Sequence, residues 1–248
     1  MGNIVTRATF LIMLLGLQSC DYLWNFFEPE FNIKEKDYVA GIVDGDPEPP
    51  YATPQMSKSS LLGIDKDNDG VRDDIEIWIN RNVDEAIIRN YLKIYIKRRK
   101  LFLTCENENE CLKAYRIHRR STECFRLINS TNWKLEKILK VENLLNQLYF
   151  NSSNKQDANS RMSKYLAATS WGSSDDLGLF LLVERFCEFE VKVDQNILEN
   201  IWNYSNRARF AHNIKRGLYE QNFDLSIDIS DYPNLCDGFN GPEQNLCD

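Results

Sequence analysis

The sequence predicts an all-α fold, in which a single helical domain follows a short ion-binding loop. Apolar residues recur at helical spacing in several segments between residues 83 and 220. Strong strand signals are missing from the sequence after residue 54. The chain beyond residue 60 has about 190 residues, which is enough for one substantial core. These three observations place the protein in the all-α class.

The first long helix is expected after Asn82 and Glu85, whose spacing resembles a capping box. Paired apolar residues follow at helical spacing as far as residue 103 and form one stripe. Five further helices are expected from apolar periodicity and capping residues, over residues 111–128, 133–150, 154–168, 177–189 and 197–220. The helix at 177–189 is strongly apolar, so it is expected in the centre of the core. The tail from residue 221 is expected to be irregular.

A run of basic residues lies on the other side of the first long helix, opposite its apolar stripe: Lys93, Lys97, Arg98, Arg99 and Lys100. We interpret the run as a solvated helix face, because most such runs in proteins have this role. Contact with anionic lipid is the alternative. Nucleic acid is not an expected partner, because the chain carries a formal net charge of −7.

Residues 65–76 are the segment with the clearest chemical role. They follow the pattern of an EF-hand loop, with Asp at alternate positions, Gly at the sixth position and Glu at the twelfth. Ca²⁺ takes about six to eight oxygen ligands, and such a loop supplies them. The expected ligands are the carboxylates of Asp65, Asp67, Asp69, Asp73 and Glu76 and the backbone carbonyl of Val71.

Each position of the loop has an expected role. Gly70 is expected to turn the chain sharply with a positive φ. The side chain of Val71 is expected to be free to vary, because only its carbonyl is a ligand. Asp73 is expected to bind through a water molecule, and Glu76 is expected to bind with both oxygens.

An Asx-rich surface turn that binds nothing is the alternative interpretation of this loop, since Asp, Asn and Gly all favour turns. A plain turn does not need alternating acids, however, and four or five carboxylates in one loop repel one another without a cation. The loop also differs from a paired EF-hand. Arg72 stands at the eighth position, where paired hands usually carry an aliphatic residue, and the sequence contains no second loop.

The lead-in and the loop, residues 61–76, resemble a segment of uncharacterised bacterial exported lipoproteins that carry a single calcium loop of the EF-hand or dockerin type. The short lead-in and the helix that follows the loop are similar to half of a dockerin. A dockerin carries two such loops, so the resemblance does not imply cohesin binding. It implies a class of protein, with Ca²⁺ as its ion, and no particular activity.

Residues 1–19 are expected to be a lipoprotein signal peptide. Residues 8–17 form an almost unbroken apolar run that is too short for a membrane span. The run leads into Leu17-Gln18-Ser19-Cys20, which resembles a bacterial lipoprotein box. Cleavage before Cys20 and lipidation of Cys20 would anchor the protein to a membrane of the bacterial cell envelope. An ordinary signal peptide and a weak N-terminal anchor helix are the alternatives.

The chain therefore divides into three expected parts. The signal peptide is followed by the lipidated cysteine and an extended proline-containing tether over residues 20–60. Residues 61–248 form the calcium loop and a helical, disulfide-stabilised domain. The domain is expected to lie on the periplasmic or outer surface of the envelope.

Six cysteines follow Cys20, and an even number of cysteines in an exported domain favours disulfides. Six cysteines allow fifteen connectivities. By proximity in the sequence and by elimination, the expected pairs are Cys105–Cys111, Cys236–Cys247 and Cys124–Cys187. The sequence has no Cys-x-x-Cys motif, and its two histidines, His118 and His212, are expected to be partly buried packing residues. A zinc site is therefore not expected.

Two functional hypotheses follow from the sequence. The first is a non-catalytic, calcium-binding envelope lipoprotein with a structural role or an envelope protein as its partner. It rests on the loop, the lipoprotein box and the lack of hydrolase, zinc-protease and phosphate-loop motifs. The alternative is a hydrolase of envelope polymers that uses carboxylates of the helix at 177–189. Glu184 and Glu188 are one turn apart there, close to Glu190.

Overall fold

The computed structural model describes residues 33–129, 135–166, 177–193, 196, 199 and 202–247 and confirms the all-α class. The elements are, in chain order, η2 (Glu35–Asp37), β1 (Ile42–Val43), β2 (Asp46–Pro47), α2 (Pro54–Ser57), α3 (Asp73–Asn82), α4 (Ala86–Thr104), α5 (Glu108–Asn129), α6 (Leu135–Tyr149), α7 (Ser153–Leu166), η3 (Leu177–Leu182), α8 (Val183–Cys187), α10 (Tyr204–Lys215), α11 (Leu218–Phe223), η4 (Ile229–Asp231) and η5 (Gly241–Leu246). The predicted signal peptide and Cys20 lie outside the described residues.

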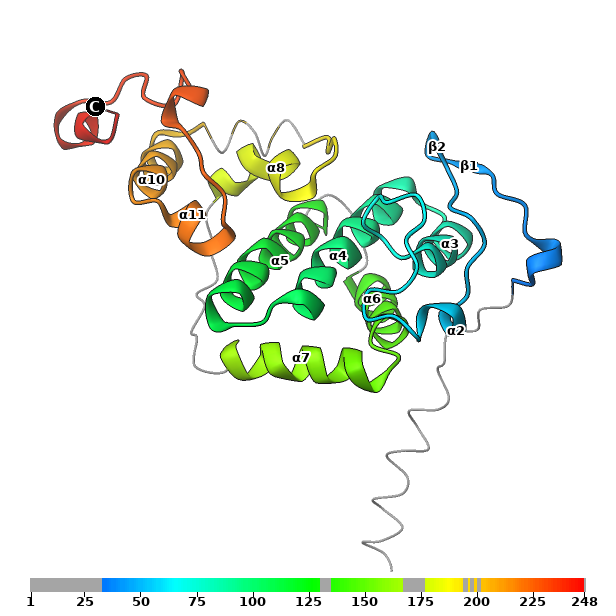
Figure 1. Cartoon of the computed structure of the whole chain (residues 1–248). Helices are drawn as coiled ribbons and strands as arrows, with labels where there is room; N and C mark the ends of the chain where they lie inside the picture. Colours follow the sequence, from blue (N-terminus) through cyan, green and yellow to red (C-terminus); the bar gives the residue numbers. More distant parts are fainter. Residues whose placement is uncertain are drawn as a thin grey trace, which may run out of the picture.

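The antiparallel pair α4 and α5 forms the centre of the fold (Figure 1). α7 packs against both of these helices, and α6 packs against α3 and α4. α8 and α11 pack against α5 on the far side from α3 (Figure 1). The C-terminal tail lies beyond α10 at one end of the molecule, and the β1–β2 hairpin lies at the opposite end beside α3 (Figure 1).

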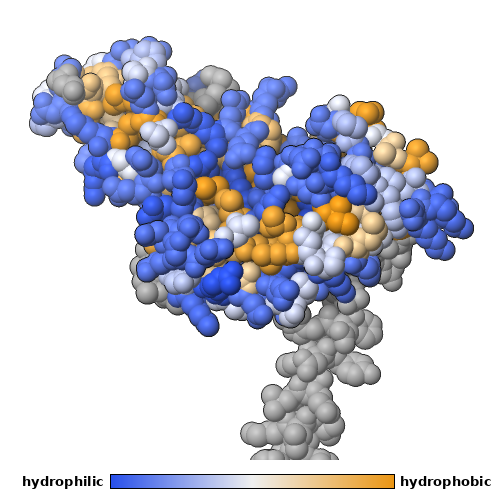
Figure 2. All heavy atoms as spheres, viewed as in Figure 1, coloured by the Kyte–Doolittle hydropathy of each residue, from blue (hydrophilic) through white to orange (hydrophobic). Residues whose placement is uncertain are grey.

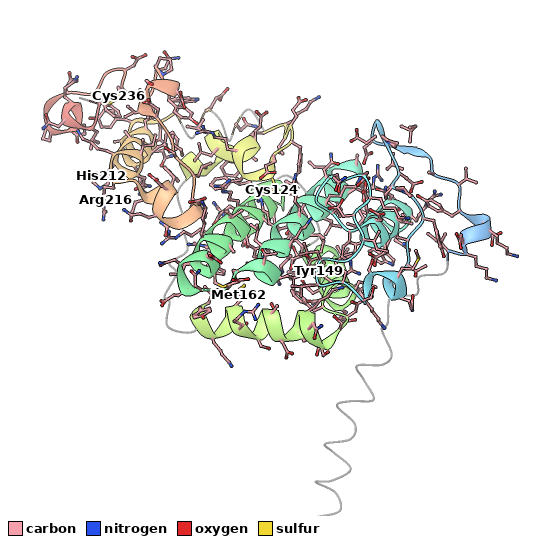
Figure 3. All side chains as sticks on the ribbon, in the orientation of Figure 1. Cys124, Tyr149, Met162, His212, Arg216 and Cys236 are labelled. Atoms are coloured by element: carbon pink, nitrogen blue, oxygen red, sulfur yellow. A yellow bond between two sulfur atoms is a disulfide. The ribbon has the colours of Figure 1, made fainter. Side chains whose placement is uncertain are left out.

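The predicted apolar stripe of α4 is confirmed, because Tyr91, Leu92, Tyr95 and Ile96 are all buried. A second, smaller cluster forms where α7 meets α4 and α5, around the buried side chains Phe102, Cys105, Cys111, Ala114 and Met162. Met162 lies on the side of α7 that faces these two helices (Figure 3). On the face drawn in Figure 2, most of the surface is hydrophilic, and hydrophobic residues gather over α4 and α5, above α7.

Two of the predicted helices are shorter than expected. The predicted helix at 197–220 is interrupted, since α10 ends at Lys215 and Gly217 has a left-handed φ of 63° before α11 begins. Glycine adopts this conformation at low cost, so it ends one helix and allows a change of direction. The predicted helix at 177–189 is a 3-10 segment followed by the short α8, which ends where Glu188 takes a φ of 60°.

The expected capping box at residues 82–85 is not formed. Asn82 is the last residue of α3, and its Nδ2 donates to the carbonyl of Trp78 at 2.8 Å. Glu85 is itself the N-cap of α4, and its side chain forms no capping hydrogen bond. A short extended link therefore separates α3 from α4.

Residues 33–60, which were expected to belong to an extended tether, fold against α3 and α4. The side chain of Glu48 is almost fully buried and pairs with Arg81 of α3. Asp44, in the turn between β1 and β2, pairs with Arg89 of α4. Ala52 is fully buried. These contacts join the segment to the helical domain over most of its length.

The described part of the chain contains three disulfides, and their pairing is the predicted one: Cys105–Cys111, Cys124–Cys187 and Cys236–Cys247. The second of them joins α5 to the end of α8, and Cys124 faces α8 in Figure 3. The third closes the C-terminal tail on itself. The 124–187 bond closes the longest stretch of chain and is therefore the one that links separate parts of the core.

A buried ion pair connects the calcium loop to the rest of the fold. The guanidinium of Arg72 pairs with Asp74, through its Nη2 at 2.7 Å and its Nε at 3.0 Å, and both side chains are at most 2% exposed. Arg72 also donates to the carbonyls of Leu148 and Tyr149, the last two residues of α6. Ser57 of α2 donates to Asp74 at 2.8 Å. One charged pair therefore holds three elements together.

We predict that Arg72→Met lowers the free energy of unfolding by about 3–5 kcal/mol, because it leaves the carboxylate of Asp74 buried without its charged partner. Urea unfolding followed by circular dichroism measures the change. Lys113→Met is the matched control, since Lys113 is 64% exposed and pairs with the partly exposed Asp224. Its effect should stay within about 1 kcal/mol. Equal effects of the two substitutions would show that Arg72 is not a central support.

We also predict that the Cys124→Ala/Cys187→Ala variant loses more stability than Cys105→Ala/Cys111→Ala. The two bonds span 63 and 6 residues. Loop-closure entropy then predicts losses of about 4 and about 2 kcal/mol. Chemical unfolding under non-reducing conditions compares the two variants with the wild type. A larger loss for the 105–111 pair would mean that local packing, and not loop closure, dominates.

Candidate metal site

The candidate metal site is the loop between α2 and α3, and its backbone has the predicted shape. Gly70 has a φ of 94°, as its position in the loop requires, and Asn68 has a φ of 61°. Asn tolerates this left-handed conformation better than most residues. α3 begins at Asp73, so the last two predicted ligands, Asp73 and Glu76, lie in its first turn. Acidic residues are favourable there because a helix N-terminus carries partial positive charge.

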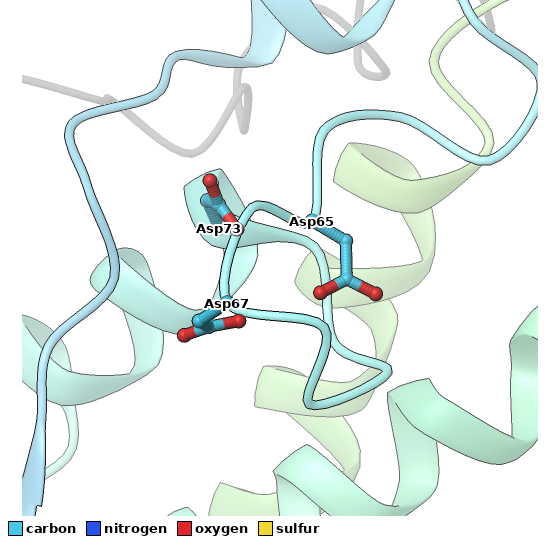
Figure 4. A group of neighbouring side chains, drawn as sticks. All are labelled: Asp65, Asp67 and Asp73. Carbon is cyan, nitrogen blue, oxygen red and sulfur yellow. The ribbon is translucent and has the colours of Figure 1, made fainter.

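The structure brings all five predicted carboxylates together. Ligand oxygens of Asp65, Asp67 and Asp73 lie within 4.8 Å of one another, and so do those of Asp67, Asp69 and Glu76. Asp67 belongs to both groups and therefore connects them into one cluster. Figure 4 shows Asp65, Asp67 and Asp73 on the loop, with Asp73 at the start of α3.

Three oxygens of this cluster are buried and have no hydrogen-bond partner within the described part of the chain: Asp65 Oδ1, Asp73 Oδ2 and Glu76 Oε2. Asp73 is fully buried as a residue, and Glu76 is 3% exposed. A buried carboxylate oxygen without a partner is costly, so such atoms are rare in folded proteins. A cation bound near these unpaired oxygens would therefore stabilise the cluster most.

The remaining oxygens hold the loop in shape. Asp73 Oδ1 accepts a hydrogen bond from the backbone nitrogen of Lys66 at 2.9 Å. Asp69 Oδ1 accepts one from the backbone nitrogen of Val71 at 2.7 Å. Hydrogen bonds of this kind fix carboxylates before an ion arrives and reduce the entropy that binding has to overcome.

The expectation that the Val71 side chain is free to vary was wrong. Val71 is 2% exposed and belongs to the main hydrophobic core. The loop turns this side chain inward, into the same cluster as Ile75 of α3. The spacing pattern of a calcium loop does not report such a contact, because it depends on what lies beneath the loop.

The basic run of α4 is not the solvated face that the sequence suggested. Lys93 Nζ lies 2.7 Å from Glu76 Oε1, and Lys100 Nζ lies 3.1 Å from Asp65 Oδ2. Arg98 is 3% exposed and donates to Glu188 and to the carbonyl of Phe186. Most of the run thus faces inward, and two of its lysines contact the predicted metal ligands. No local pattern in the sequence points to this pairing, because the partners are 17 and 35 residues apart.

Burial and neighbouring charge change the acidity of the two buried ligands. Burial raises the pKa of Asp73, and the charges of Asp67 and Asp65 raise it further, although the hydrogen bond from Lys66 opposes them. Burial also raises the pKa of Glu76, against the hydrogen bond and charge of Lys93. Both groups therefore bind protons more readily in the folded protein than in the unfolded chain.

The other residues that the sequence offered for chemistry do not form a second site. Glu184, Glu188 and Glu190 are all exposed, and Glu188 pairs with Arg98. His118 is a packing residue, as expected: it lies between the rings of Tyr95 and Phe102, and burial lowers its pKa well below the usual value.

His212 differs from its expected environment, because it is exposed on α10 (Figure 3). Its position on the outer side of a short helix explains the difference, since that helix presents little of its surface to the core. His118 and His212 therefore lie on different helices in different surroundings, one in the centre of the fold and one at its surface.

The chain matches no protein family, no curated protein and no solved structure. None of the helices in the described ranges combines the length and the apolar character that crossing a membrane requires.

Without calcium, the contribution of Asp73 and Glu76 to the free energy of unfolding should fall as the pH rises from about 4 toward neutrality. Their ordinary pKa values are 3.8 and 4.5, and the folded state raises both, so it binds more protons than the unfolded state in this window. Calcium binds the deprotonated carboxylates, so its effect on Tm should grow over the same range.

Differential scanning fluorimetry with calcium or with a chelator measures both trends. The difference between the wild type and the Asp73→Asn/Glu76→Gln variant isolates the two groups from the other titrating residues. If chelated wild-type protein gained stability over the variant as the pH rose, the assignment of raised pKa values would be wrong.

Proposed function

We propose that this protein is a calcium-binding lipoprotein of the bacterial cell envelope, in which the ion has a structural and non-catalytic role. The observation that carries the proposal is the set of three buried, unpartnered oxygens on Asp65, Asp73 and Glu76 within one carboxylate cluster. A divalent cation in that cluster would bind such oxygens, directly or through water, and would also reduce the repulsion among the carboxylates.

Calcium is the ion that this set of ligands fits best. The cluster offers oxygen ligands, without a histidine or cysteine among its members, which disfavours zinc and the softer transition metals. Mg²⁺ needs near-ideal octahedral geometry and usually keeps several waters, whereas Ca²⁺ accepts many protein oxygens in flexible arrangements. A loop with five acidic ligands and a left-handed glycine supports the larger ion.

A structural role follows from how the loop is held. Arg72, in the loop itself, is fixed to Asp74 and to the end of α6. Glu76 lies in the first turn of α3, so an ion bound to Asp65 and Glu76 would tie the start of the loop to that helix. The sequence contains no second loop against which this one could move. A large opening of the kind that sensor EF-hands undergo is therefore not expected.

The exposure of Glu184 in α8, and of Glu188 and Glu190 just after it, supports the non-catalytic role over the hydrolase hypothesis. A general acid and a nucleophile need a shared site that excludes water, whereas Glu184, Glu188 and Glu190 are exposed. Anchoring to the membrane through Cys20 rests on the lipoprotein box and on the resemblance of residues 61–76 to exported lipoproteins. An envelope protein is the partner class that fits such an anchored helical domain.

The calcium proposal predicts weak, stoichiometric binding, with a Kd of about 10⁻⁴ to 10⁻³ M as in extracellular modules. Isothermal titration with CaCl₂ should show one site in the wild type and none in Glu76→Gln. Glu190→Gln, an exposed glutamate outside the loop, is the matched control and should bind as the wild type does. If titration of the wild type with CaCl₂ gave no heat of binding, or if Glu76→Gln gave the same heat as the wild type, the site would be refuted.

The structural role predicts where protection changes. At about 100 times the Kd, calcium should add about 2.7 kcal/mol to the free energy of unfolding. Hydrogen exchange should slow mainly in residues 60–80, with little change in helix content by circular dichroism. If residues 177–218 changed most, the ion would be acting as a switch between distant helices.

The lipid anchor has its own test. Metabolic labelling with palmitate should mark the wild type and should not mark Cys20→Ala, because the thiol that receives the lipid is lost. Mass spectrometry of the mature protein should find Cys20 as the first residue. Equal labelling of the two proteins, or a mature chain that still begins at Met1, would contradict the proposal.

A further inference from the structure

Three lysines of α4 lie against the calcium loop. Lys93, Lys97 and Lys100 are four and three residues apart, so they share one face of the helix. Lys93 and Lys100 contact Glu76 and Asp65. A Cβ atom placed on Gly70 would lie 3.2 Å from the Cε of Lys97, so the stem of Lys97 crosses the loop at its sharpest turn.

Each of the two ion pairs occupies half of a predicted calcium ligand. Lys93 takes Oε1 of Glu76 and leaves Oε2 buried and unpaired. Lys100 takes Oδ2 of Asp65 and leaves Oδ1 buried and unpaired. The lysines therefore supply positive charge from the helix side, while the unpaired oxygens belong to the carboxylate cluster. The arrangement satisfies part of the loop and leaves the rest for a cation.

Two lysines are not enough to neutralise the carboxylates of the loop. Five carboxylates and two paired ammonium groups leave an excess of negative charge, even before the surrounding solvent is considered. Bidentate binding by Glu76, the usual role of the twelfth position, needs both of its oxygens. The ammonium group of Lys93 and a calcium ion therefore compete for Oε1.

We propose that Lys93 and Lys100 replace the cation of the loop when calcium is absent, and that calcium displaces the Lys93 ammonium from Glu76 when it binds. This inference rests on the calcium site proposed above. It makes Lys93 a residue that weakens calcium binding and stabilises the calcium-free loop. The loop then stays folded in both states, and α4 changes its contacts with the occupancy of the loop.

The decisive experiment is calcium titration of Lys93→Met, which keeps the length of the stem and removes the charge. Loss of the competing ion pair should lower the Kd for CaCl₂ roughly fivefold, the factor that corresponds to an ion pair of about 1 kcal/mol. Lys93→Arg should bind close to the wild type. In the presence of a chelator, Lys93→Met should melt at a lower temperature than the wild type, and saturating CaCl₂ should remove most of that difference.

Lys97→Met is the matched control, because Lys97 lies on the same helix face and forms no ion pair within the described ranges. It removes the same charge without releasing a ligand, so its Kd should change by less than about twofold. If Lys97→Met tightened binding as much as Lys93→Met, general repulsion would explain the effect, and the displacement would be refuted.

A direct readout of displacement comes from reductive ¹³C-methylation of the lysines, followed by NMR. CaCl₂ should shift the dimethyl signal of Lys93 and should leave that of the exposed Lys36 unchanged. If wild-type protein and Lys93→Met both fail to bind CaCl₂, the calcium site itself is wrong. If the wild type binds but the signal of Lys93 does not move and Lys93→Met binds no tighter, the site stands and the displacement is refuted.

Discussion

The buried pair of Arg72 and Asp74 is the interaction on which the N-terminal half of the fold depends. Arg72 donates hydrogen bonds to two carbonyls at the end of α6, and Asp74 accepts a hydrogen bond from the hydroxyl of Ser57 in α2. The carbonyl of Ser57 in turn accepts from Lys155, a fully buried lysine of α7. The position of Arg72 also requires a glycine at residue 63, because a Cβ on Gly63 would lie 2.6 Å from the Cδ of Arg72. A charged pair taken out of water needs such a complete set of partners.

This arrangement explains why a lone loop can exist. In a paired EF-hand the eighth position joins the loop to its sister, but Arg72 at that position turns into the core. The face of the loop that remains is covered by α4 and its lysines. Both sides of the loop are thus supported by helices of the same domain. A loop held in this way fits a structural role better than a conformational switch.

Local signals in the sequence predicted the parts of the structure that depend on local contacts. The spacing of residues 65–76 gave the left-handed turn at Gly70 and the gathering of the carboxylates, because loop geometry follows from a few neighbouring residues. The disulfides between near neighbours followed from proximity, and the pair 124–187 followed by elimination.

The errors came from contacts between residues far apart in the chain. Glu48 is separated from Arg81 by 33 residues, and Asp65 is separated from Lys100 by 35. No periodicity encodes such pairs, so the fold of residues 33–60 and the inward direction of the basic run could not be read from the sequence. The break at Gly217 is different, since a glycine late in a helical pattern is itself a signal for a helix end.

The folding of residues 33–60 onto the domain would limit how far a lipid-anchored form of the protein could reach from its membrane. If Cys20 carries the proposed lipid, residues 21–32 are the whole spacer. A fully extended chain covers about 3.3–3.6 Å per residue, so the spacer spans about 43 Å at most. That distance is close to the thickness of one bilayer, about 40–45 Å with its headgroups. The domain would therefore stay beside the membrane that holds it, and its partners would have to come to that surface.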